Sequence, residues 1–121
     1  MIIDQPNTLE EMIERTKIAE HIVWRRRNGA ESWKNPFRAM DYLKIDKAKA
    51  LEIIQSLSRL DRFKRDKNRS NPENEDVWIF WKPIIKDDKE SVLYIKISSR
   101  ASGDLYVHSF HVNQGKYKKK D

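Results

Sequence analysis

Apolar positions in the first part of the chain follow a helical spacing. Thr8 and Glu11 have the spacing of a capping box, in which each side chain covers a free backbone amide at a helix start. An apolar stripe with a period of about 3.6 residues continues from there to Val23. Arg25–Arg27 follow, where cations are favourable at a helix C-terminus, and Gly29 can end the helix. The pattern predicts one long first helix that ends near these arginines.

Two further helices are predicted before residue 62. Pro36 suits the first turn of a short helix that continues through Phe37 and Met40 to Tyr42. Asp46 is placed as the N-cap of a third helix. The residues expected on the buried stripe of that helix are Ala50, Leu51, Ile54, Leu57 and Leu60.

The hydrophobic period changes to two in the second half of the chain, which indicates strands. The runs Val77–Ile85, Val92–Ser99 and Leu105–Val112 are rich in aromatic and β-branched residues. Polar residues separate the first two runs, and a turn that contains Gly103 separates the last two. Such short connections predict an antiparallel meander, to which residues 63–67 can add an edge strand.

These elements together predict an α+β fold in which N-terminal helices pack on one face of a C-terminal antiparallel sheet. We expect one domain over residues 1–121, because the length suits one core. Its expected parts are N-terminal helices over 1–45, a central helix over 46–61, the sheet over 62–113 and a basic tail over 114–121.

Composition excludes several classes of protein. The chain has no cysteine, so disulfides, thiolate zinc sites and thiol nucleophiles are excluded. The start of the sequence does not have the pattern of a signal peptide, and no apolar run approaches the roughly 18 residues of a membrane span. We therefore expect a cytoplasmic protein with no membrane partner.

The net charge of +6 is unevenly distributed, with most of the positive excess in residues 25–69. A basic block beside acidic segments is a possible footprint for nucleic acid, and Arg25, Arg26 and Arg27 are its densest part. A lysine-rich surface that only contacts solvent is the alternative.

Alternation along the strands assigns candidate residues to faces. Leu93, Ile95 and Ile97 share the face expected against the helices, so Tyr94 and Lys96 share the opposite face, about 7 Å apart. There a ring can stack on a base and an ammonium can hold a phosphate, although both residue types are also common on solvated strands.

Histidine is the side chain best suited to proton transfer near neutral pH, and His108 and His111 lie in the last predicted strand. At a spacing of three, regular alternation points them to opposite faces, so we expect no shared metal. One of them can be catalytic, or both can be structural; we expect His21, on the first predicted helix, to be structural. No phosphate-binding loop or dinucleotide fingerprint occurs, so we expect no cofactor.

Residues 40–112 resemble the MqsR family of toxins from bacterial toxin–antitoxin pairs, which adopt a RelE-like ribonuclease fold. After the helix over 48–60, the segments that carry the resemblance are Arg-Phe-Lys-Arg at 62–65, Val-Trp-Ile-Phe-Trp-Lys-Pro at 77–83, Leu-Tyr-Ile-Lys-Ile at 93–97 and His-Ser-Phe-His at 108–111.

The resemblance implies roles for individual residues. The catalytic tyrosine of the family falls on Tyr94, and its C-terminal lysine falls on His111. Its lysine after a Phe-Tyr pair falls on Arg65, or on Lys64 with a slip of one residue. The glutamine of its Trp-rich strand has no match here.

The leading hypothesis is a metal-independent endoribonuclease toxin with an antitoxin partner. The expected catalytic residues are Tyr94, Lys96, His111 and Arg65. The expected RNA-binding residues are Lys64, Arg62, Arg25, Arg26, Arg27 and Trp81. The alternatives are a non-catalytic nucleic-acid-binding module and a protein-interaction domain, of the phage or immunity type, in which Trp78 or Trp81 is the hot spot.

Overall fold

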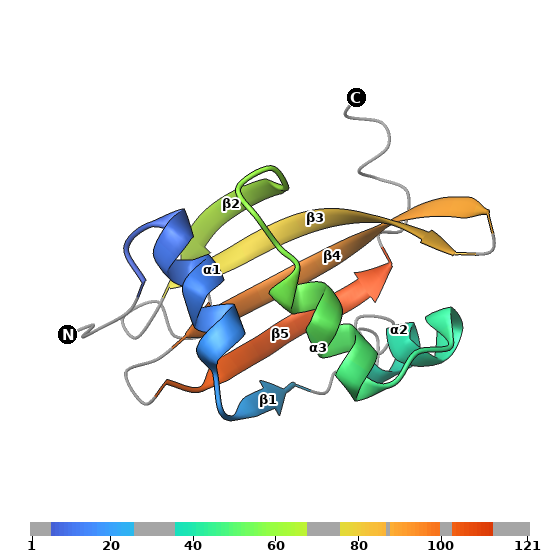
Figure 1. Cartoon of the computed structure of the whole chain (residues 1–121), viewed down its shortest axis with the longest axis horizontal. Coiled ribbons are helices and arrows are strands. Elements are labelled where there is room, and N and C mark those ends of the chain that lie inside the picture. Colours follow the sequence, from blue (N-terminus) through green and yellow to red (C-terminus); the bar gives the residue numbers. More distant parts are fainter. Residues whose placement is uncertain (1–5, 26–35, 68–75, 87, 100–102, 113–121) are drawn as a thin grey trace.

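The computed structural model describes residues 6–25, 36–67, 76–86, 88–99 and 103–112, and within them the fold is α+β (Figure 1). In chain order the elements are α1 (Leu9–Ile18), β1 (Ile22–Trp24), α2 (Pro36–Leu43), α3 (Lys47–Gln55), β2 (Arg62–Lys67), β3 (Asp76–Lys86), β4 (Lys89–Ser99) and β5 (Leu105–Val112). No helix among the described residues is long and apolar enough to cross a membrane. Arg26, Arg27, Gly29 and the segment 114–121 lie outside the described residues.

The five strands form one sheet in the order β1-β5-β4-β3-β2. Strands β2 to β5 are the expected antiparallel meander, and the edge strand expected at residues 63–67 is present as β2. At the other edge β1 pairs parallel to β5. The sheet is therefore mixed, and the prediction of a purely antiparallel sheet was wrong.

The parallel strand consists of residues that were predicted to end the first helix. The capping box is confirmed, since the Thr8 hydroxyl accepts from the Glu11 amide at 3.1 Å, but α1 ends at Ile18. Residues 22–24 are β-branched or aromatic, and pairing with β5 satisfies their backbone while Ile22 and Trp24 pack on the core. The apolar residues read as the end of a helical stripe therefore belong to a strand.

The other two helices begin where expected, and α3 ends earlier than expected. The Asp46 carboxylate accepts from the Lys49 amide at 2.8 Å, which confirms the N-cap. The helix ends at Gln55. Leu57 is buried as predicted, but it belongs to the segment that follows the helix. Leu60 is 90 % exposed, and its predicted place on a buried stripe was wrong.

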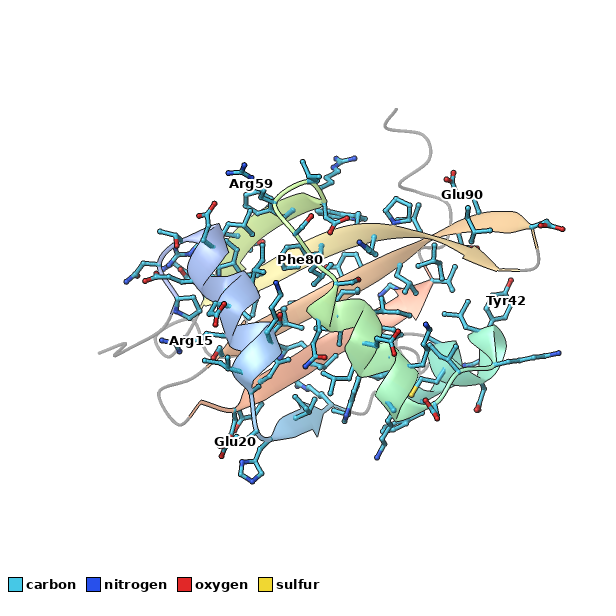
Figure 2. All side chains as sticks on the ribbon, in the orientation of Figure 1. Arg15, Glu20, Tyr42, Arg59, Phe80 and Glu90 are labelled. Carbon is cyan, nitrogen blue, oxygen red and sulfur yellow. The ribbon has the colours of Figure 1, made fainter. Side chains whose placement is uncertain are left out.

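One hydrophobic cluster joins the helices to the sheet. Figure 1 shows α1 and α3 lying across one face of the sheet, and Figure 2 shows Phe80 between them near the centre of β3. We call the side of the sheet that supplies this cluster the core face. Its fully buried members from β3, β4 and β5 include Phe80, Leu93, Ile95, Ile97, Leu105, Val107 and Phe110.

A β-bulge in β5 changes which residues face the core. Lys96 pairs with Ser109 and Ile97 pairs with Val107, so His108 is an extra residue between two registered pairs. Val107 and Phe110, three residues apart, both lie in the core cluster. His108 and His111 consequently share the opposite face, and the prediction that they point to opposite faces was wrong.

The bulge predicts an unusual tolerance of deletion. Removing His108 joins Val107 directly to Ser109, which restores regular alternation and keeps Phe110 opposite Ile95. Deleting Phe110 instead removes a fully buried core ring, a loss of about 3–5 kcal/mol by analogy with truncation to alanine. We expect the first deletion to fold and the second to be far less stable in urea denaturation; equal losses would contradict the bulge register.

Candidate functional site

The face of the sheet opposite the core face carries most of the candidate residues, and we call it the polar face. Side chains reach it from every second position of β2, β3 and β4, and from β5 as the bulge dictates. Its members include Arg62, Lys64, Asp66, Val77, Ile79, Trp81, Tyr94, Lys96, Ser98, Tyr106, His108, Ser109 and His111, and the same alternation continues through Pro83, Ile85, Glu90 and Val92 toward the β3–β4 turn. Six residues chosen from the sequence, Arg62, Lys64, Trp81, Tyr94, Lys96 and His111, therefore share one face.

Four of these residues form a row that crosses the sheet in direct register: Arg62, Trp81, Tyr94 and His111. The Arg62 guanidinium lies over the Trp81 ring, 5.1 Å from its centroid. The Trp81 and Tyr94 rings meet edge to face at 5.8 Å, and the Tyr94 and His111 rings stack at 4.9 Å. Such pairs are favourable beyond the area that they bury, so the row holds Tyr94 in a fixed place.

A second row runs beside the first, about 7 Å away along the strands. It consists of Lys64, Ile79, Lys96 and Ser109, again in direct register. The two lysines flank Ile79, which is only 6 % exposed, from β2 and β4. The backbones of the two lysines are two strand spacings apart, about 10 Å, and Lys64 Nζ lies 3.6 Å from the Asp66 carboxylate on the same face.

The third part of the face is a buried polar pair that the sequence did not single out. Ser98 Oγ and His108 Nε2 are 2.8 Å apart, and both residues are buried. The Tyr106 ring stacks on the His108 ring at 6.4 Å. The bulge brings His108 to the same face as Ser98. The one sequence signal for this pairing is that the apolar positions of β5 shift from odd to even residue numbers between Val107 and Phe110.

His111 has a defined tautomer when its ring is neutral. Its Nδ1 lies 3.2 Å from the carbonyl oxygen of Val112, and a carbonyl can only accept, so Nδ1 carries the proton. The second nitrogen, Nε2, then holds the lone pair that can accept a proton. The residue is 4 % exposed, which places this basic nitrogen inside the protein rather than at its surface.

Arg65 lies on the other side of the sheet from Tyr94. It pairs with Trp78 of β3, and its guanidinium lies over that ring at 5.0 Å. Its Nε donates to the Asp76 carboxylate at 2.7 Å, and one terminal nitrogen donates to the carbonyl of Asn7 at 2.9 Å. The structure therefore does not bring Arg65 together with Tyr94, and Lys64 is the neighbouring cation on the polar face.

Arg25 lies far from Lys64, at the opposite edge of the sheet. It follows β1, and its amide donates to the carbonyl of Val107 at 3.0 Å. Four strand spacings, about 19 Å, separate the backbones of β1 and β2. Arg25 is thus not brought to the cations of β2, and Arg26 and Arg27 lie outside the described residues.

The polar face combines aromatic rings, histidines and lysines, and several of its members are buried, among them Ser98, His108, Ser109 and His111. In the part of the chain that the structure describes, no three His, Asp or Glu side chains are grouped so that they could hold a metal ion. Comparison with known proteins adds no relative: no protein family, no curated protein and no solved structure matches the chain. The geometry of the polar face is therefore the basis of any functional conclusion.

Proposed function

We propose that this protein is a metal-independent endoribonuclease, acting in the cytoplasm as the toxin of a toxin–antitoxin pair. The observation that carries the proposal is the placement of Tyr94, His111 and Lys96 together on the polar face. A phenol, an imidazole and an ammonium side by side supply the proton-transfer groups and the cation that phosphodiester cleavage needs. The resemblance of residues 40–112 to the MqsR family supports the same conclusion.

The proposed reaction is attack by the RNA 2′-hydroxyl on the adjacent phosphorus. A base removes the 2′ proton as the new O–P bond forms, and an acid gives a proton to the 5′-oxygen as its bond to phosphorus breaks. The products are a 2′,3′-cyclic phosphate and a free 5′-hydroxyl. No redox partner or organic cofactor takes part, because no electron leaves or enters the substrate.

In this scheme His111 and Tyr94 exchange the protons. The lone pair on His111 Nε2 suits the base, and the Tyr94 hydroxyl suits the acid or orients the 2′-oxygen. Lys96, together with Lys64 in the same row, stabilises the negative charge on the pentacoordinate phosphorus. Arg62 and Trp81 extend the contact toward β2, where the nucleotide chain can continue.

A second candidate function is a nucleic-acid-binding module without catalysis. The observation that favours it is the burial of His111 and Ser109, which are 4 % and 2 % exposed. A histidine stacked on Tyr94 and shielded from solvent can serve as part of a rigid aromatic row rather than as a base. The cations would then hold phosphates with no proton transfer.

Incubation of single-stranded RNA of mixed sequence with the protein in excess EDTA distinguishes the two functions. We expect cleavage that leaves 2′,3′-cyclic phosphate ends, and none with a Tyr94→Phe/Lys96→Ala variant. Salt-sensitive binding without cleavage would instead identify the binding module. Absence of binding as well would favour a protein-interaction domain and reject both.

A further inference from the structure

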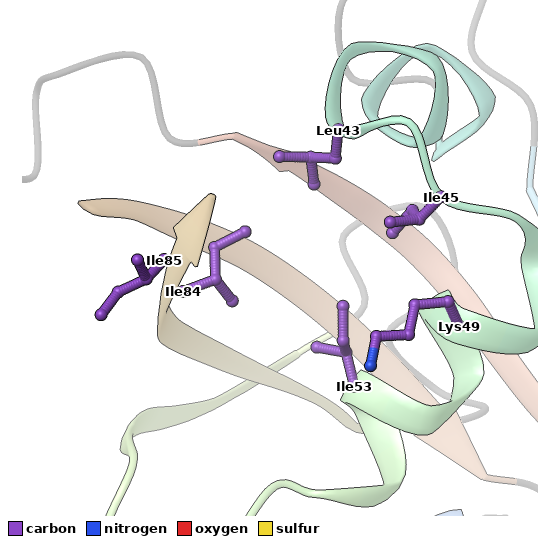
Figure 3. A pocket seen from close by; sticks show the side chains of 6 residues that line it. All are labelled: Leu43, Ile45, Lys49, Ile53, Ile84 and Ile85. Atoms are coloured by element: carbon purple, nitrogen blue, oxygen red, sulfur yellow. The ribbon is translucent and has the colours of Figure 1, made fainter. Parts of the chain in front are cut away.

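An apolar pocket lies where the two helices α2 and α3 meet the end of β3, and none of the residues proposed to act on RNA lines it. Its volume is about 420 Å³. Figure 3 shows its six lining residues, with Ile84 on the side of β3 that faces Ile45, Lys49 and Ile53, and Ile85 on the other side of the strand at the rim. The six are Leu43, Ile45, Lys49, Ile53, Ile84 and Ile85. A volume of this size is within the range of small-molecule sites, which combine apolar walls with a few placed polar groups.

The lining combines five aliphatic side chains with one cation. Lys49 and Ile53 are four residues apart on α3, so they lie one above the other on the same side of the helix. Figure 3 shows the amine end of Lys49 beside Ile53. A ligand lying on Ile53 therefore meets apolar surface along its length and an ammonium at its end.

The partner that Lys49 has in the structure can be replaced. Its Nζ lies 3.1 Å from a carboxylate oxygen of Glu52, and the two side chains are 55 % and 69 % exposed. An ion pair so exposed is worth little, because water and salt screen it. A ligand carboxylate that also buries its hydrocarbon chain can take the place of Glu52.

We propose that this pocket binds an aliphatic carboxylate, a linear or branched hydrocarbon chain with one carboxylate end. The chain lies against Ile45, Ile53 and Ile84, and the carboxylate meets Lys49. Ile85, which is 76 % exposed, loses solvent contact when the chain covers it. This activity is separate from RNA cleavage, since none of the residues proposed for RNA cleavage or RNA binding lines the pocket.

Titration with fatty acids, observed through isoleucine methyl signals in NMR spectra, tests the proposal. We expect octanoate to shift the methyl signals of Ile53 and Ile84 and to leave that of the exposed Ile18 on α1 unchanged. Between hexanoate and decanoate, each added methylene is expected to tighten binding by up to about fourfold. Absence of shifts at millimolar octanoate would overturn the proposal.

Head-group variants and protein variants test the role of Lys49. Octanol and octylammonium are expected to bind more weakly than octanoate; equal binding by either would overturn the assignment of the carboxylate. Lys49→Met should weaken the affinity for octanoate by about three- to fivefold. Glu52→Gln should strengthen that affinity, because it removes the carboxylate that competes for Lys49. Tighter binding of N-acetyl-leucine than of octanoate would overturn the proposal in favour of a peptide C-terminus.

The matched pair Ile85→Asp and Ile18→Asp locates the site without disturbing the fold, because both side chains are largely exposed. The first variant should abolish octanoate binding, since it places a negative charge at the pocket. The second should bind as the parent does. Equal effects of the two would overturn the location, and neither outcome depends on whether the protein cleaves RNA.

Discussion

Replacing Lys96 with methionine is expected to lower the rate of RNA cleavage by about 10²–10³-fold, the loss typical of removing one group that stabilises charge in a transition state. Lys96 stands between the two pairs that frame the site, Tyr94–His111 on one side and Ser98–His108 on the other. Methionine keeps an unbranched apolar chain beside Ile79, so packing on the polar face is retained while the ammonium is lost.

Single-turnover cleavage of RNA, with the enzyme in excess, measures this effect on the chemical step. Lys49→Met is the matched control, because it removes an ammonium on the side of the molecule that holds the pocket. The midpoint of urea denaturation should be nearly the same for the parent and both variants. Cleavage by Lys96→Met within about threefold of the parent rate would remove Lys96 from the mechanism.

The central strands could be predicted from the sequence because their side chains alternate without interruption. In β4, Leu93, Ile95 and Ile97 are fully buried in the core cluster, as alternation required. That assignment fixed Tyr94 and Lys96 on the other face. A local period of two suffices wherever each face has one uniform environment.

Strand β5 shows where local pattern ceases to be sufficient. Its apolar residues Leu105 and Val107 are two positions apart, and so are Phe110 and Val112, but Val107 and Phe110 are three positions apart. Strict alternation cannot bury both pairs, and the bulge at His108 resolves the conflict. The prediction also extended the first helix over residues 22–24, because the local pattern contains no information about their pairing with β5.

The cations of β2 show a further limit. The sequence resemblance could not choose between Lys64 and Arg65, because the two are adjacent and chemically alike. Their faces depend on the register with β3, in which Lys64 stands opposite Ile79 and Arg65 opposite Trp78. A slip of one residue exchanges the two faces, so only the pairing itself assigns one cation to the polar face.

Replacing Arg65 with methionine is accordingly expected to destabilise the fold by about 3 kcal/mol and to leave the chemical step unchanged. The substitution removes the 2.7 Å contact to Asp76, a carboxylate that is only 9 % exposed. Lys67 still reaches the same carboxylate at 3.1 Å, which keeps the loss at the lower end of the range for breaking a buried pair. The bond to the Asn7 carbonyl, just before α1, is lost as well.

Lys64→Met is the matched variant, one residue away on the opposite face. Its side chain is 61 % exposed, so we expect unchanged stability, weaker RNA binding and a smaller salt dependence of that binding, by about 0.7 in the logarithmic slope. Urea denaturation and RNA binding at several salt concentrations measure the two effects for both variants. Should Arg65→Met lose cleavage at full stability while Lys64→Met keeps it, the site would lie on the core face of β2, and the proposed roles of Tyr94 and Lys96 would be wrong.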